Sequence, residues 1–158
     1  MDNEKEFEGL ACVFMSVEQK NLSSDENDHN SARTYVLLKS LGADVTFIRG
    51  KYKGREEKSL LISNPSQMLV IMLPIIAKKF NQESIMLVST ENRVTLVYSE
   101  EGKPSEQIGR LTVKTNPKSV LEDESFSIDL KRMIAYVVVS EEEYAELEKN
   151  QGEAYEMA

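Results

Sequence analysis

Apolar residues recur along the chain in blocks separated by polar stretches. Residues 10–17 are apolar almost throughout, which predicts a buried strand. From residue 28 to 41 the apolar positions return every three or four residues, which predicts an amphipathic helix that Gly42 ends. Residues 43–49 alternate and are rich in β-forming side chains, so we expect a second strand there.

The same pattern continues to the C-terminus. We expect a third strand over 59–63 and a strongly apolar helix over 65–80 that contains Pro74 and is kinked or interrupted by it. Ser140 begins a capping box that Glu143 completes, which predicts a short C-terminal helix. Further strands are predicted over 84–89, 93–99, 107–114, 126–130 and 134–139.

The first six elements have the order β-α-β-β-α-β. This order predicts an α/β (α+β) fold, a ferredoxin-like sandwich with additional C-terminal strands and a short C-terminal helix. Both long helices would cover one face of the sheet. Because several strands are apolar on both sides, we expect the other face to be covered by the C-terminal strands or by another subunit. The prediction is one domain over residues 1–150, with 151–158 as a disordered tail.

Composition narrows the class of protein. The 158 residues suit a single domain, and 41% of them are hydrophobic. The net charge of −8 argues against binding nucleic acid, although the acidity is concentrated at the ends. Residues 1–30 have eight acids and two bases, residues 141–158 seven and one, and the middle has sixteen bases against twelve acids.

Cysteine use and apolar run length bear on location. The one cysteine, Cys12, excludes an internal disulfide and lies in an apolar run, where a buried, unreactive thiol is the simpler interpretation. The longest apolar stretch, residues 68–77, is half the length of a membrane span. No signal-peptide pattern opens the sequence. We therefore expect a cytoplasmic protein that does not bind membranes.

Candidate chemistry gathers in residues 49–59, RGKYKGREEKS. Five cationic side chains surround Glu56 and Glu57, and two glycines frame Tyr52. One interpretation is a long hairpin whose charges only keep the surface solvated. The other is a ligand-holding loop, in which the tyrosine stacks on the ligand, the cations hold an anionic group, and one glutamate faces a cation or hydroxyl groups.

A second candidate lies at the end of the apolar helix. Gln82 and Glu83 are either a polar helix exit or ligand contacts. The sequence has no glycine-rich phosphate loop and no Cys/His metal spacing. Its one histidine, His29, lies in a polar stretch typical of a surface residue, so we predict no metal and no catalytic triad.

Over residues 13–98 the chain resembles the small phage-encoded enzymes that degrade S-adenosylmethionine, recognised as lyases. The resemblance rests on Asn21-Leu22 before an acidic helix start, on residues 50–59, on Gln82-Glu83-Ser84 and on Leu96-Val97-Tyr98. It implies a fold similar to the trimeric PII-like signalling proteins, with the active site between adjacent subunits. It also implies an anti-restriction role, in which the methyl donor of some host restriction systems is depleted.

The implied reaction cleaves S-adenosylmethionine into methylthioadenosine and homoserine lactone without a cofactor. If the substrate's own carboxylate attacks its γ-carbon, charge is lost in the transition state, so a glutamate pressed on the sulfonium would slow the reaction. We therefore expect Glu57 to hold the ammonium or the ribose. By resemblance the catalytic acid is Glu57, with Glu56 next, and the substrate-binding residues are Tyr52, Gly54, Arg55, Asn21, Gln82 and Glu83.

Two other functions fit the sequence. One is a PII-like protein that binds an adenine nucleotide without chemistry, for which the cationic loop is suited to phosphates. The other is a phage inhibitor of a host enzyme that uses the acidic chain ends as its contact. Hydrolysis of S-adenosylmethionine is also left open, since lyase and hydrolase differ only in the nucleophile.

Overall fold

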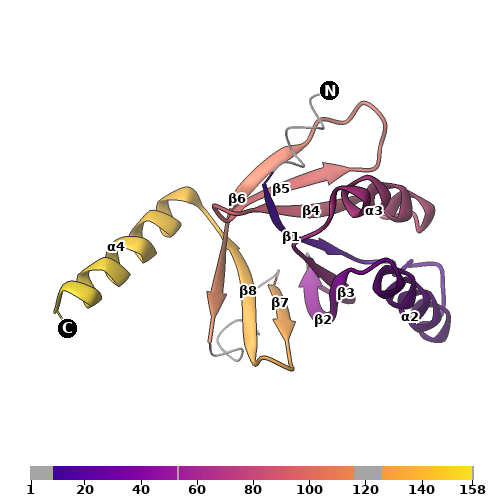
Figure 1. Ribbon diagram of the computed structural model, residues 1–158, viewed down its shortest axis with the longest axis horizontal. Coiled ribbons are helices and arrows are strands. Elements are labelled where there is room, and N and C mark those ends of the chain that lie inside the picture. Colours follow the sequence, from indigo (N-terminus) through magenta and orange to yellow (C-terminus); the bar gives the residue numbers. More distant parts are fainter. Residues whose placement is uncertain (1–8, 53, 116–125, 158) are drawn as a thin grey trace.

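A computed structural model describes residues 9–52, 54–115 and 126–157 (Figure 1). This part of the chain contains eight strands and three helices. They are, in order, β1 (Leu10–Met15), α2 (Ser24–Ser40), β2 (Asp44–Tyr52), β3 (Arg55–Ser63), α3 (Gln67–Lys79), β4 (Ser84–Ser89), β5 (Arg93–Tyr98), β6 (Glu106–Lys114), β7 (Phe126–Asp129), β8 (Ile134–Val139) and α4 (Glu141–Met157).

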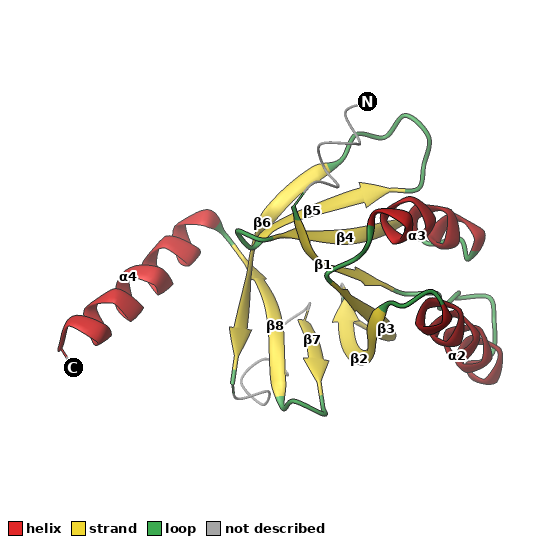
Figure 2. Cartoon of the chain, in the orientation of Figure 1, coloured by secondary structure: helices red, strands yellow, loops and turns green. Residues whose placement is uncertain are grey.

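The strands form one antiparallel sheet that closes into a barrel in the order β1-β3-β2-β7-β8-β6-β5-β4 (Figure 2). The predicted β-α-β-β-α-β order of the first six elements is confirmed, but the ferredoxin-like sandwich is replaced by a barrel. The physical reason is that β7 pairs with β2, at Arg49↔Ile128, and extends the sheet round to β4. The second face of the sheet was expected to be covered either by the C-terminal strands or by another subunit. In the barrel the C-terminal strands cover it.

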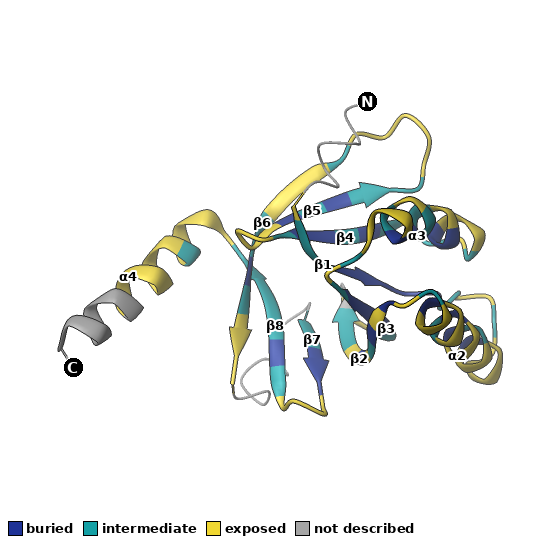
Figure 3. Cartoon of the chain, viewed as in Figure 1, coloured by how far each residue is buried: buried dark blue, intermediate teal, exposed yellow. Residues whose placement is uncertain are grey.

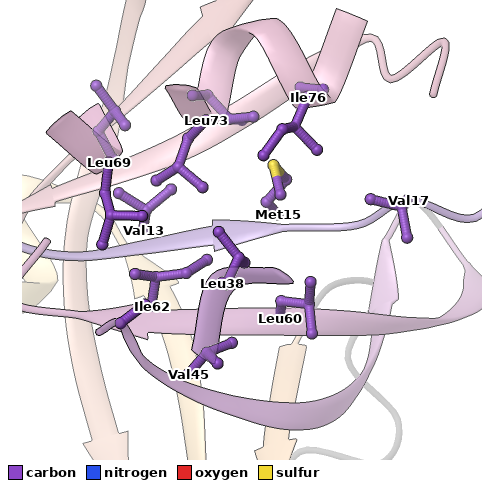
Figure 4. Close-up of a cluster of buried hydrophobic side chains, with 14 residues drawn as sticks. Val13, Met15, Val17, Leu38, Val45, Leu60, Ile62, Leu69, Leu73 and Ile76 are labelled. Atoms are coloured by element: carbon purple, nitrogen blue, oxygen red, sulfur yellow. The ribbon is translucent and has the colours of Figure 1, made fainter. Parts of the chain in front are cut away.

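Helices α2 and α3 pack on the outside of the barrel, on the same side (Figure 2). Figure 4 shows Leu38 of α2 and Leu73 of α3 converging over β1 and β3, and both side chains are fully buried. Helix α2 begins earlier than expected because Ser23 and Glu26 form a capping box. Helix α3 begins after Ser66, whose side chain caps it, and continues through Pro74.

A second apolar cluster fills part of the barrel interior. Because neighbouring strand residues face opposite sides, β1 directs Val13 to the helices and Phe14 to the interior. Phe14 meets Tyr136 of β8 edge to face, with ring centroids 5.4 Å apart. Cys12 packs against this cluster, and burial raises its pKa to about 11, so the thiol stays protonated at neutral pH.

Strand β6 changes partner directly after Gly109. Its first half, up to Arg110, pairs with β5, and its second half, from Arg110 on, pairs with β8. Gly109 has φ +141°, and a Cβ there would collide with the carbonyl oxygen of Val139. A residue without a side chain is therefore required where the sheet bends to close.

Two segments differ from the expected local structure. The expected long loop between β2 and β3 is instead a tight hairpin in which Tyr52 pairs with Arg55. Lys51 and Glu56 face each other across it, and Gly54 provides the positive φ of +80° that the turn needs. At the other end of the chain, α4 runs from Glu141 to Met157 and is longer than the short helix that was expected.

Helix α4 projects away from the barrel (Figures 1 and 3). It is attached at its first turns, where Arg110 pairs with Glu141 at 2.9 Å and its guanidinium lies 4.8 Å from the Tyr144 ring. No helix in the described ranges combines the length and apolarity that crossing a membrane requires.

Candidate active site

A cavity of about 630 Å³ opens where β1 ends and β3 begins. An eight-stranded barrel can enclose one small ligand, and this volume falls within the usual range for ligand sites. The apolar and aromatic part of the lining comes from barrel strands and includes Phe14, Met86, Leu96, Leu111, Phe126, Tyr136 and Val138. The charged part comes from Glu18, Lys20, Lys51, Arg55, Glu57 and Glu83.

Glu57 faces this cavity because of its place in β3. Leu61 belongs to the barrel-interior cluster, and residues two and four positions before it, Ser59 and Glu57, share its side of the strand and line the cavity. Burial raises the pKa of Glu57 above the ordinary glutamate value, Glu18 raises it further, and Arg55 lowers it. The site therefore holds a partly desolvated carboxylate with a second carboxylate near it.

The segment after β1 is held in place by hydrogen bonds to β3. The Ser16 hydroxyl donates to the Lys58 carbonyl at 2.9 Å and accepts from the backbone N–H of Glu18 at 3.1 Å. The Glu18 carboxylate accepts from the backbone N–H of Lys58 at 2.9 Å. These bonds fix a glutamate at the cavity that sequence analysis did not identify.

The corner between α3 and β4 supports the same segment. The Gln82 side-chain amide donates to the carbonyl oxygens of Glu18 at 2.6 Å and Phe80 at 3.1 Å. Asn81 donates to the Gln19 side chain at 2.8 Å. Both hydrogens of the Gln82 side-chain amide are thus donated to backbone carbonyls of the protein. Gln82 therefore holds the backbone of Glu18 in position.

The predicted site residues divide into three groups. Gly54 and Glu56 are exposed, and neither lines the cavity. The Tyr52 side chain lies outside what the structure describes. Those that the fold brings together around the cavity are Asn21, Arg55, Glu57, Gln82 and Glu83.

Gly50, one of the two glycines that frame Tyr52, is required for the packing of β2 against β7. It lies within β2 and lines the cavity, and a Cβ there would come 2.5 Å from the carbonyl oxygen of Phe126. The glycine allows β7 to approach β2, which brings Phe126 and Ser127 to the cavity.

Sequence analysis also missed Tyr136 of β8. Tyr136 is among the residues that line the cavity, and burial raises the pKa of its phenol, which therefore stays neutral at neutral pH. Residue 136 of the 158 lies in an apolar strand that gave no local sign of a site. Among the described residues, no three His, Cys, Asp or Glu side chains gather in a way that could hold a metal ion.

A comparison with protein families identifies the family of this chain. The sequence model of the S-Adenosylmethionine lyase family matches residues 13–139. The chain belongs to this family. The matched region begins within β1 and ends with β8. It contains the other seven strands of the lyase's barrel and the residues that line the cavity, whereas α4 lies outside it.

The predicted lyase family is therefore confirmed, and the chain is an enzyme that cleaves S-adenosylmethionine. A search of curated proteins finds no match to the lyase.

Proposed function

We propose that the lyase binds S-adenosylmethionine inside the barrel cavity and turns it into methylthioadenosine and homoserine lactone. The observation that carries the proposal is a ligand-sized cavity with an apolar, aromatic inner wall and three glutamates, Glu18, Glu57 and Glu83, among its charged residues. The adenosine would lie among the apolar side chains. The cationic methionine part, with its sulfonium and ammonium, would lie among the charged ones.

The reaction needs no group from the protein to enter the products. An oxygen of the substrate carboxylate attacks the γ-carbon, the carbon–sulfur bond breaks, and its electron pair stays on sulfur. The sulfonium becomes the neutral thioether of methylthioadenosine, and the methionine carbons leave as homoserine lactone with its ammonium. The protein's contribution is then to fold the substrate so that carboxylate and γ-carbon meet.

The partly apolar cavity favours this step. A negative carboxylate and a positive sulfonium combine, so the transition state has less separated charge than the bound substrate. Taking both groups out of water therefore raises the energy of the substrate more than that of the transition state. A carboxylate placed against the sulfonium would offset this gain, so Glu57 is assigned to another part of the substrate.

Product analysis tests the reaction. We expect purified protein incubated with S-adenosylmethionine to yield methylthioadenosine and homoserine lactone together, measured by mass spectrometry at early times. Homoserine formed from the start, before any lactone, would replace the lyase step with hydrolysis. Unchanged substrate would overturn the reaction and with it the anti-restriction role that we propose for a phage-encoded lyase in the host cytoplasm.

Assembly as a PII-like homotrimer is a further part of the proposal. Its support is the family resemblance together with apolar side chains on the outer helix faces, where Val36, Ile71 and Ile75 are each about 64–65% exposed. One chain lines the cavity described here, so such an interface need not complete it. We expect a mass of about 54 kDa by light scattering, three times the 17.9 kDa chain, and a stable monomer would contradict the trimer.

A further inference from the structure

We propose that Glu18 binds the ammonium group of the substrate and that Glu57 binds the ribose hydroxyls. This inference rests on the proposed function and deepens it, because it assigns the two carboxylates different parts of the same ligand. Glu18 follows a buried strand rather than lying in the charged motif, and the fold alone brings it to the site.

Glu18 is held as a rigid binding group. Three contacts fix it: its backbone N–H bonds the Ser16 hydroxyl, its carbonyl accepts from Gln82, and its Oε1 accepts from the Lys58 N–H. These partners come from the end of β1, from the corner before β4, and from β3. With Oε1 anchored at 2.9 Å, the carboxylate is pre-organised to offer Oε2 to a cation at little cost in side-chain entropy.

The two carboxylates repel each other, and a cationic ligand bound near both of them would reduce this repulsion. Both line one cavity, and Glu18 raises the pKa of Glu57 while Arg55 only partly opposes it. A ligand with two positive groups relieves this repulsion when it binds. S-adenosylmethionine carries both a sulfonium and an ammonium, whereas a nucleotide would bring further negative charge.

The places of Glu57 and Glu18 along the cavity determine which part of the substrate each one binds. Glu57 pairs across the hairpin with Gly50 and lies on the strand face that continues into the apolar interior through Leu61. Glu18 lies beyond the end of β1, next to exposed Lys20 and the cavity residue Asn21. In the substrate the ribose follows the adenine and the ammonium is at the far end. An adenine in the interior therefore places the ribose at Glu57 and the ammonium at Glu18.

Two ligands that differ in their charged groups test the assignment. S-adenosylhomocysteine keeps the ammonium and carboxylate but has a neutral sulfur, and methylthioadenosine keeps the ribose and lacks the amino acid part. Loss of a hydrogen bond to a charged group is expected to weaken binding about tenfold or more. Calorimetry should show that Glu18→Gln weakens S-adenosylhomocysteine by this factor and leaves methylthioadenosine within about twofold. Glu57→Gln should weaken both.

The controls separate a binding role from a structural one. Gln can still accept the Lys58 N–H bond, so Glu18→Gln is expected to melt within a few degrees of wild type, and Glu142→Gln on α4 should bind both ligands normally. Equal losses for both ligands in Glu18→Gln would make Glu18 a purely structural residue, and unchanged affinities would remove it from the ligand. Either result with normal cleavage by wild type overturns this inference alone, whereas a wild type that neither binds nor cleaves overturns the proposed function.

Discussion

Replacing Glu57 with glutamine is expected to lower the turnover of S-adenosylmethionine at least about tenfold, which corresponds to about 1.4 kcal/mol in the activation barrier. The amide keeps the size of the side chain but loses the charge that orders the substrate's hydroxyl groups in the cavity. Initial rates of methylthioadenosine formation at saturating substrate measure the loss. Rates equal to wild type would remove Glu57 from the site.

The neighbouring acid provides the matched comparison. Glu56 is exposed and lies on the opposite side of β3, so Glu56→Gln is expected to change turnover less than Glu57→Gln.

The stability of Glu57→Gln provides a second check on the role of Glu57. Since the folded-state pKa of Glu57 is raised, its ionised form destabilises the fold at pH values above that pKa. At neutral pH Glu57→Gln should therefore lose activity without a lower melting temperature, and a clear drop would indicate a structural role.

Replacing Gly109 with alanine is expected to lower the free energy of unfolding by at least about 2 kcal/mol. This loss corresponds to a melting temperature about 4–8 °C lower. At φ +141° an L-residue is strained, and the new Cβ would collide with the Val139 carbonyl, which is rigid backbone in β8. The chain must then open the junction of β6 with β8 or distort it. Thermal unfolding followed by circular dichroism measures the effect.

Gly102→Ala is the control for this prediction. Gly102 also has a positive φ, +82°, but a Cβ there would meet no atom within 4 Å. Its substitution adds only the strain of an L-residue at a positive φ, so a larger loss in Gly109→Ala measures the collision together with the less favourable φ at the barrel junction. If both variants melted at the same temperature, the close approach at Gly109 would have no energetic weight.

Local sequence patterns predicted the elements well and their assembly poorly. The strands 84–89 and 134–139 have the predicted bounds because their apolar runs end at polar residues. Pairing of β2 with β7 joins residues almost eighty positions apart, and no local pattern encodes such a contact. The sequence therefore predicted a sandwich, and the barrel is apparent only from the pairing of the strands.

The same distinction explains the site. The choice between Glu56 and Glu57 depends on where β3 begins, and a strand extended back to Arg55 would have placed Glu57 on the face of Leu61. Glu18 and Tyr136 had no comparable sign, since each reaches the cavity through contacts between distant segments. The resemblance to the family predicted the activity and the charged strand. The residues of the cavity's inner wall could be identified only from the fold.

The closure of the barrel also sets when the enzyme can become active during its synthesis. The cavity lining runs from Phe14 to Val138, and β8 must pair with β6 before the wall is complete. A nascent chain is translated over several seconds, during which β1 to β4 can fold locally while the last wall is still missing. A ribosome therefore produces a catalyst only after it has translated β8, and a copy terminated before β8 would leave S-adenosylmethionine uncleaved.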